Sequence, residues 1–250
     1  MADYPLEALD LAVGYDGPLI RRISFRVGAG EIVALIGPNG SGKSTILKTL
    51  SGQLKSWGGQ IRVCGRELGS FPPKELSQKL ALLLTEPIRP ERMTCREVVE
   101  TGRYPYTGYF GRLSAKDSRV VEESMALVEM EAFAGASFTE ISDGQRQRVM
   151  LARAVCQEPE VLLLDEPTAF LDIYHKATFF QLLRQLTEER KMGVVISMHE
   201  PELAARVAGY AVCIRERAVF RMGKAEEVLR PEGVRELFGV PEALYERYYG

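Results

Sequence analysis

The chain has 250 residues, of which 46% are apolar and 26% charged, and its formal net charge at neutral pH is -2. These values are typical of a globular protein with one sizeable core, and they argue against a surface for nucleic acid, as no dense Lys/Arg block occurs. The sequence predicts no membrane span and no signal peptide, and its four widely separated cysteines predict buried free thiols in a reducing cytosol rather than a metal site.

The first part of the chain predicts an antiparallel sheet. Residues 6–13 and 19–27 read as strands on either side of a glycine-rich turn at 14–18, and residues 58–65 read as a hairpin. Tyr15 in that turn could stack on an adenine ring. A half-exposed turn tyrosine explains the residue equally well.

Residues 37–44 have the spacing of a phosphate-binding loop, with two glycines and then Lys-Ser. A buried strand is predicted before it at 31–36 and a helix after it at 45–51, which is the context that the motif requires. Glycine backbone N–H groups and the helix start favour bound phosphate, Lys43 adds charge for the outer phosphates, and the Ser44 hydroxyl can ligate Mg2+. The residues predicted to contact the nucleotide here are Gly37, Pro38, Asn39, Gly40, Ser41, Gly42, Lys43, Ser44 and Thr45.

The middle of the chain, from residue 85 to about 157, shows no strand pattern and predicts a helical lobe inserted into an α/β core. Ser114 with Asp117 forms one capping box, and Ser142 with Gln145 forms another at the start of the last helix of the lobe. Gly144 in that second helix start makes it suitable for phosphate, although most capped helices bind nothing.

Two later strands are predicted to position catalytic or metal-binding side chains at their carboxyl ends. The apolar run 161–164 is followed by Asp165, suited to hold Mg2+ through water, and by Glu166, suited to polarise an attacking water. The strand 194–197 is followed by His199, which could reach the outer phosphate. Between them, a helix capped by Asp172 is predicted to face inward with Ile173, Ala177, Phe180, Leu183 and Leu186, and to leave His175 solvated. A closing hairpin at 211–220 and short helices from 225 to 237 complete the chain.

Together these residues resemble the ATP-binding cassette of ABC transporters over nearly the whole chain. Residues 37–44 match the Walker A motif, 161–166 the Walker B motif, 141–145 the family signature, 169–172 the D-loop, and His199 the switch histidine. The resemblance implies a single domain, 1–250, with a P-loop NTPase (RecA-like) α/β core, an N-terminal antiparallel β subdomain and an inserted α-helical subdomain. The expected divisions are 1–85 and 158–224 for the core with its β subdomain, 86–157 for the helical subdomain, and 225–250 for short C-terminal helices.

Residues 101–106 and 171–175 resemble the subgroup that serves importers of iron–siderophore complexes, haem and cobalamin. The resemblance implies a homodimer in which ATP and Mg2+ lie between the phosphate loop of one copy and Ser142, Gly144 and Gln145 of the other. It implies catalytic roles for Lys43, Glu166 and His199, and metal contacts from Ser44, Asp165 and Glu86. The implied partners are a membrane permease, contacted through 86–111 with Tyr104, Tyr106, Tyr109 and Phe110, and indirectly a substrate-binding protein. The implied location is the cytoplasmic, inner face of the cell membrane.

Two departures from the family pattern leave alternatives open. Glu86 stands where Gln is usual, and its carboxylate would repel the γ-phosphate. Asp143 stands in the signature where Gly is usual, and it would weaken ATP-driven dimerisation if it faced the nucleotide but would favour the helix start if it faced solvent. The alternatives to a transport ATPase are a soluble cassette, such as an iron–sulphur assembly ATPase, and a cassette that binds ATP but hydrolyses it weakly.

Overall fold

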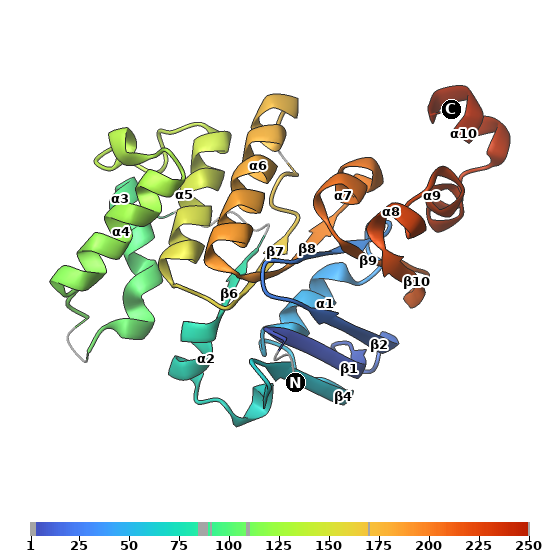
Figure 1. The fold of residues 1–250 in the computed structure, drawn as a ribbon, viewed down its shortest axis with the longest axis horizontal. Helices are drawn as coiled ribbons and strands as arrows, with labels where there is room; N and C mark the ends of the chain where they lie inside the picture. Colours follow the sequence, from blue (N-terminus) through green and yellow to red (C-terminus); the bar gives the residue numbers. More distant parts are fainter. Residues whose placement is uncertain (1–3, 85–89, 91, 109–110, 170, 250) are drawn as a thin grey trace.

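A computed structural model of the chain describes residues 4–84, 90, 92–108, 111–169 and 171–249 (Figure 1). The strands are β1 Leu6–Val13, β2 Ile20–Val27, β3 Ile32–Ile36, β4 Gly58–Val63, β5 Arg66–Glu67, β6 Leu80–Leu83, β7 Val161–Asp165, β8 Gly193–Met198, β9 Tyr210–Arg215 and β10 Ala218–Lys224. The α-helices are α1 Lys43–Leu50, α2 Pro73–Lys79, α3 Cys95–Glu100, α4 Ala115–Leu127, α5 Asp143–Cys156, α6 Ile173–Arg190, α7 Pro201–Val207, α8 Ala225–Val228, α9 Pro231–Phe238 and α10 Glu242–Tyr249. Short 3-10 helices are η1 Leu68–Ser70, η2 Thr101–Tyr106 and η3 Glu131–Phe133.

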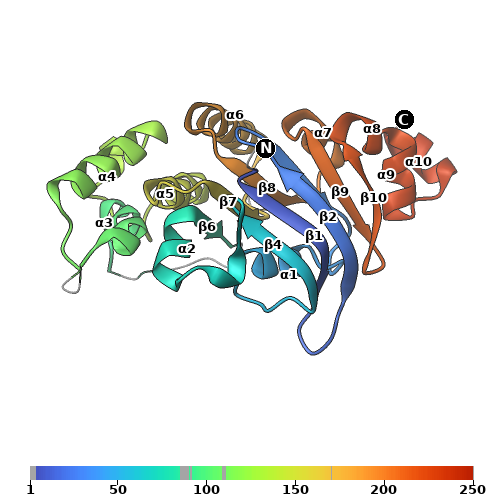
Figure 2. The same cartoon turned by 60° about the horizontal axis from the view of Figure 1, so that its bottom comes forward.

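The strands form two sheets, as the sequence predicts. The N-terminal sheet has the order β2-β1-β4-β5 and is antiparallel, whereas the second has the order β10-β9-β3-β8-β7-β6 and is parallel except for β10. One core packs α1 between the two sheets, and a second core covers the other face of the parallel sheet with α5, α6 and α7 (Figure 2). This architecture is the predicted α/β fold with an antiparallel sheet beside the phosphate loop.

The central strands position the site because their carboxyl ends meet at one edge of the parallel sheet. Every residue of β3, β7 and β8 is buried, which is typical of parallel strands covered on both faces. In the register, Asp165 at the end of β7 lies opposite Ser197 in β8, and Ile36 at the end of β3 lies opposite Met198. The loops that follow these three strands therefore leave the sheet side by side.

The helical lobe is confirmed for the described part of residues 92–157, where α3, α4 and α5 pack together at one end of the molecule (Figure 1). The predicted capping boxes at Ser114 and Ser142 are both formed, and Thr94 with Glu97 makes another. Apart from an isolated bridge between Thr94 and Ser137, no β structure occurs in the described residues of this lobe. The division of the chain into core, lobe and C-terminal helices stays a prediction.

The prediction for the first turns of α6 is wrong. Ile173 is 88% exposed and Ala177 is also exposed, while Phe179 is buried together with Phe180 and Leu183. Both apolar residues share the helix face of Phe180, but none of the described elements buries this face at the first turns of α6. His175 is only half exposed, and its packing is described below.

Three of the four cysteines, Cys95, Cys156 and Cys213, are buried thiols, and Cys64 is partly buried. Burial raises the pKa of Cys156 and of Cys213 to about 11, which keeps both protonated and unreactive at neutral pH. In the part of the chain that the structure describes, no helix combines the length and apolar character needed to cross a membrane.

The turn between β9 and β10 is strained. Glu216 and Arg217 have φ values of 50° and 60°, and their neighbours Arg215 and Ala218 pair directly, so the turn is a two-residue hairpin turn of the kind that favours glycine. We expect Arg217→Gly to raise the free energy of unfolding by about 0.5–1 kcal/mol, because glycine adopts this conformation without a Cβ clash. Urea denaturation measures the change. Ala218→Gly, one residue further on in the strand, should lower stability, and equal effects of the two substitutions would contradict the assignment of strain to the turn.

Candidate active site

The phosphate loop leaves β3 at Ile36 and enters α1 at Lys43, as predicted. Gly40 and Gly42 have φ values of 73° and 105°, which side chains disfavour. Gly37 is required for a different reason, because a Cβ there would lie 2.1 Å from the carbonyl oxygen of Ile214 in β9. The glycines therefore set the shape of the loop and let it pack tightly on the sheet.

The loop has the unsatisfied polar groups that a bound anion would satisfy. The buried hydroxyl of Ser41 has no hydrogen-bond partner among the described residues. The N-terminus of α1 has no side-chain cap and no acidic residue in its first turn. Free N–H groups at a helix start and an unpaired buried hydroxyl fit phosphate oxygens, so the loop residues fit the predicted nucleotide.

Lys43 is buried and lies across this loop. Its Nζ donates hydrogen bonds to the carbonyl oxygens of Gly37, at 2.8 Å, and Pro38, at 3.1 Å. Burial lowers the pKa of Lys43, while the charges of Glu166 and Asp165 oppose that change. The ammonium group is thus held inside the loop by weak carbonyl acceptors that a phosphate could replace.

The Asp165 carboxylate accepts hydrogen bonds from two hydroxyl groups that belong to different elements. Ser44 Oγ donates to Asp165 Oδ1 at 3.0 Å, and Ser197 Oγ donates to the same oxygen at 2.7 Å. A hydroxyl and a carboxylate are ligand types that Mg2+ accepts when phosphate and water complete its shell. No group of three or more His, Cys, Asp or Glu that could hold a metal occurs among the described residues. The pair fits the predicted magnesium contacts, and Glu86, the third predicted contact, lies outside the described residues.

The other two predicted catalytic residues meet Lys43 at the same edge of the sheet. His199 Nε2 pairs with Glu166 Oε1, and His199 Nδ1 lies 3.4 Å from Lys43 Nζ. Lys43 Nζ is also 3.8 Å from Glu166 Oε1. Glu166 itself adopts a φ of 46°, and such strain in a residue other than glycine is typical of functional sites. The structure therefore brings Lys43, Glu166 and His199 into one cluster.

Ser197 is a site residue that the sequence prediction missed. Besides donating to Asp165, its hydroxyl accepts a hydrogen bond from the backbone N–H of Glu166 at 2.9 Å. It thereby holds both carboxylate residues of the β7 end in place. Its position two residues before His199, on a buried strand, was the only signal available.

We expect Ser197→Ala to lower both stability and turnover. The substitution leaves the Glu166 N–H without this acceptor, at a cost of about 1–3 kcal/mol, and it removes one hydroxyl donor from Asp165, which keeps the bond from Ser44. Denaturation and steady-state ATP hydrolysis measure the two effects. Ser197→Thr retains the hydroxyl and should therefore keep more of the stability and of the turnover than Ser197→Ala. Equal losses in the Ala and Thr variants would contradict the role of the hydroxyl.

Tyr15, predicted to stack on adenine, lies in the β1–β2 turn with 57% of its surface exposed. The chain's single tryptophan supports that turn, because Trp57 Nε1 donates to the carbonyl oxygen of Gly14 at 3.2 Å. The ring of Tyr15 is therefore accessible, on a turn that is fixed from the neighbouring strand.

The structure does not bring the signature residues to the phosphate loop within one chain. Among the described residues, no hydrogen bond or ion pair joins Ser142, Gly144 or Gln145 to residues 37–45. Ser142 and Gln145 bond each other in the capping box, at 2.9 and 3.3 Å. In the single chain Asp143 is exposed and pairs with Arg146, and its carboxylate in the first turn of α5 favours the helix start.

The predicted permease-facing segment is only partly described. Tyr104 is 61% exposed, whereas Tyr106 is half-buried and donates from its hydroxyl to the carbonyl oxygen of Gln157 at 2.9 Å. Tyr109 and Phe110 lie outside the described residues. Tyr104 is thus free to contact a partner, and Tyr106 mainly anchors the segment to the lobe.

The sequence pattern of the ABC transporter family matches residues 20–169. An uncharacterised ABC transporter ATP-binding protein of Methanocaldococcus jannaschii, MJ0873, is 41% identical and covers 98% of this chain and 85% of its own. The iron(3+)-hydroxamate import ATP-binding protein FhuC of Bacillus subtilis is 35% identical and covers 94% of this chain and 88% of its own.

Two solved structures have the same fold. A metal-chelate-type ABC transporter in an inward-facing conformation has a TM-score of 0.84 at 26% identity and covers 96% of this chain and 90% of its own. The dimeric cassette MJ0796 bound to ADP and phosphate after hydrolysis has a TM-score of 0.74 at 26% identity and covers 88% of this chain and 98% of its own. Together with the phosphate loop and the carboxylates beside it, these similarities show that the chain belongs to the ABC transporter family, as one of its ATP-binding and ATP-hydrolysing cassettes.

Proposed function

We propose that this chain hydrolyses Mg-ATP at a site shared by two copies, and that hydrolysis powers import of a metal chelate through a separate membrane permease. The observation that carries the first part is the cluster of Lys43, Glu166 and His199 beside the Ser44–Asp165 pair. The signature residues of the same chain are not bonded to this cluster, so a second copy would complete the site with its Ser142, Gly144 and Gln145. Dimerisation of the similar cassette MJ0796 supports this arrangement.

Each residue of the cluster has a separate task in this proposal. Mg2+, held through Ser44 and Asp165, would neutralise charge on the phosphate oxygens. Glu166 orients the attacking water and accepts a proton from it as the general base. His199 holds the Glu166 carboxylate in position through their direct pair. Lys43 exchanges its contacts with Gly37 and Pro38 for phosphate oxygens, and the exposed ring of Tyr15 stacks on adenine.

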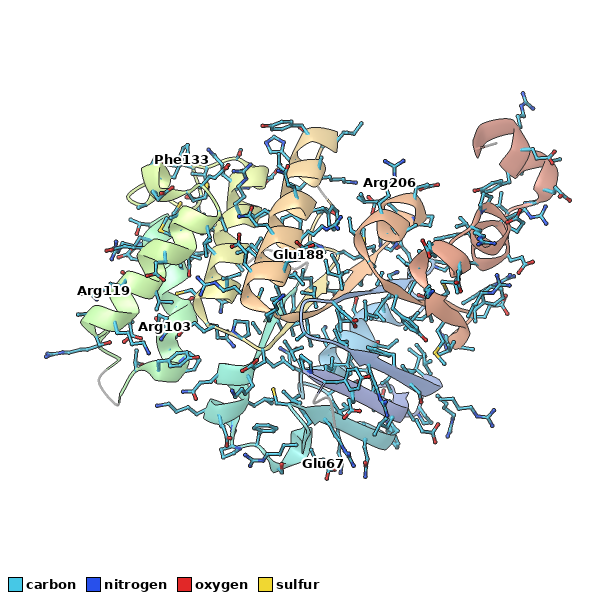
Figure 3. The ribbon with its side chains drawn as sticks, in the orientation of Figure 1. Glu67, Arg103, Arg119, Phe133, Glu188 and Arg206 are labelled. Carbon is cyan, nitrogen blue, oxygen red and sulfur yellow. The ribbon has the colours of Figure 1, made fainter. Side chains whose placement is uncertain are left out.

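The permease would dock in a groove of about 750 Å3 between the end of α1, β4, η1, α2 and β6. Its apolar lining includes five half-buried side chains, Leu54, Leu68, Phe71, Leu76 and Leu82. Glu67, labelled at the lower edge of Figure 3, lies on its rim. Helix α2 lines the groove with Pro73, Leu76 and Ser77. Two other residues of the same helix hold the 101–107 segment, since Gln78 Nε2 donates to Pro105 O at 2.9 Å and Lys74 Nζ donates to Thr107 O at 3.0 Å.

Import of a metal chelate is supported by the relative named for iron(3+)-hydroxamate import and by the metal-chelate-type transporter of similar fold. In this function the cassette works on the cytoplasmic, inner face of the cell membrane. The permease and a substrate-binding protein outside the cassette select the cargo.

The test combines hydrolysis with partner capture. We expect the purified chain to hydrolyse ATP only with Mg2+, and the tagged chain to co-purify with a multi-span membrane permease from its own cells. Leu68→Glu in the groove should abolish co-purification and retain Mg-ATP hydrolysis, whereas Leu244→Glu on exposed α10 should change neither. Capture of soluble partners alone, with no permease, would overturn the transport assignment, and absent hydrolysis would overturn the shared site.

A further inference from the structure

The signature glycine contacts a side chain of another helix in its own chain. Helices α5 and α6 lie side by side (Figure 1), and His175 in the first turn of α6 lies against Gly144 in the first turn of α5. A Cβ at Gly144 would lie 2.4 Å from His175 Cδ2, and 3.0 Å from both Cγ and Nε2. Gly144 does not have a positive φ, so the position of the imidazole, rather than backbone conformation, requires glycine here.

The imidazole is held in this position by its own helix start. His175 Nδ1 lies 2.8 Å from Asp172 Oδ1, and the same oxygen caps α6 by accepting the His175 backbone N–H at 2.8 Å. These bonds from His175 lower the pKa of Asp172, the backbone bond most, so the carboxylate remains charged at neutral pH. The Tyr174 ring also meets the imidazole edge-on, with centroids 5.4 Å apart. The imidazole therefore cannot easily rotate away from a side chain added at residue 144.

The contact connects two parts of the chain that would serve different nucleotides. Glu166 lies just upstream of the Asp172 cap, and it belongs to the nucleotide on its own phosphate loop. Gly144 lies beside Ser142 and Gln145, which in the proposed dimer meet the nucleotide held by the partner copy. Among the described residues, His175 provides a contact between the helix that follows Asp172 and the signature helix.

We propose that His175 is a positioning residue for the signature, setting the place of the first turn of α5 through its packing on Gly144 and so linking the two ATP sites of the dimer. This inference rests on the proposed shared site. A shift of the α6 start, when the segment after Glu166 responds to its nucleotide, moves the imidazole and with it the signature turn that serves the other nucleotide. The glycine at 144 is then required by its own chain as well as by the incoming phosphate.

A double-mutant cycle tests the contact. Gly144→Ala, His175→Ala and the combined variant are made in the Glu166→Gln background, and Mg-ATP-dependent dimerisation is measured by light scattering. We expect Gly144→Ala to weaken dimerisation by about tenfold, and addition of His175→Ala to recover most of that loss, because the new methyl group fills the space of the removed ring; such coupling is typical of contacting residues. Nucleotide affinity of the monomer should be the same in all variants.

His175→Gln adds a second readout, since a glutamine can retain part of the packing and should dimerise better than the alanine variant. The inference is overturned if Gly144→Ala dimerises normally, or if the combined variant is no better than Gly144→Ala. Failure of the proposed function would give different results. In that case the Glu166→Gln parent would not dimerise with Mg-ATP at all, or Ser142→Ala would dimerise as well as the parent.

Discussion

Replacing Glu166 by Gln is expected to lower the rate of ATP hydrolysis by about 100-fold or more while leaving Mg-ATP binding intact. A positioned general base contributes about 10²–10⁴-fold to a rate, and the amide cannot accept the proton of the attacking water. Binding is retained because Lys43, Ser44 and Asp165 keep their places, and Gln has nearly the shape of Glu. Single-turnover hydrolysis and the affinity for a fluorescent ATP analogue measure the two effects separately.

Glu200→Gln is the matched control, because this glutamate follows the end of β8 as Glu166 follows the end of β7, but it pairs with Lys176 instead of the cluster. It should retain near-normal turnover. Hydrolysis at the normal rate in the Glu166 variant would contradict the assignment of Glu166 as the general base. Equal losses of hydrolysis rate in both variants would indicate a general effect of the lost charge.

The largest expected effect on stability is that of Arg103→Met. Arg103, labelled in Figure 3, is 1% exposed. Its guanidinium donates to Asp117 Oδ1 at 3.0 Å and to Glu158 Oε2 at 2.7 Å. It also donates to the carbonyl oxygen of Cys156 at 2.8 Å and stacks 3.8 Å from the Tyr106 ring centroid. Removing one partner of a buried ion pair costs about 3–5 kcal/mol, because the other charge remains buried without compensation. Chemical denaturation should show a loss of this size.

The loss should depend on pH. Although burial raises the pKa of Asp117, hydrogen bonds from Ser114 and Arg103 leave it below the ordinary value of an aspartate. A lowered pKa stabilises the wild type above the ordinary value of about 4, and that stability is lost as the pH falls through the folded-state pKa. In Arg103→Met the unpaired Asp117 can protonate, so the difference from wild type should narrow in acid. Arg184→Ala, in an exposed pair with Glu188, should cost at most about 0.5 kcal/mol, and an equally small loss at Arg103 would contradict the network.

Much of the site is predictable because its chemistry is local. The phosphate loop works through glycine conformation and the start of one helix, all within residues 37–45, so its spacing is visible in the sequence. The strands β3, β7 and β8 are continuous apolar runs, and the residues just beyond them, Asp165, Glu166 and His199, must lie at one edge of a parallel sheet. Family membership follows from the order of these motifs.

Other features depend on contacts between residues far apart in the chain. Ser197 reaches Asp165 only because the register of β7 and β8 places them opposite each other. Gly144 is restricted by His175, and Gly37 by the Ile214 carbonyl oxygen, in ways that no local pattern encodes. Ile173 has the helical spacing of a core residue, yet the described part of the chain leaves it 88% exposed.

Amino-acid order by itself determined the motifs, the strand and helix types and the capping boxes, since each depends on neighbours within one turn or one strand. Only the tertiary structure decided which charge is buried, as for Arg103, which charge forms a pair at the surface, as for Asp143, and which helix meets the signature turn. Burial and electrostatic partners are properties of assembled surfaces, and those surfaces exist only when distant segments pack together.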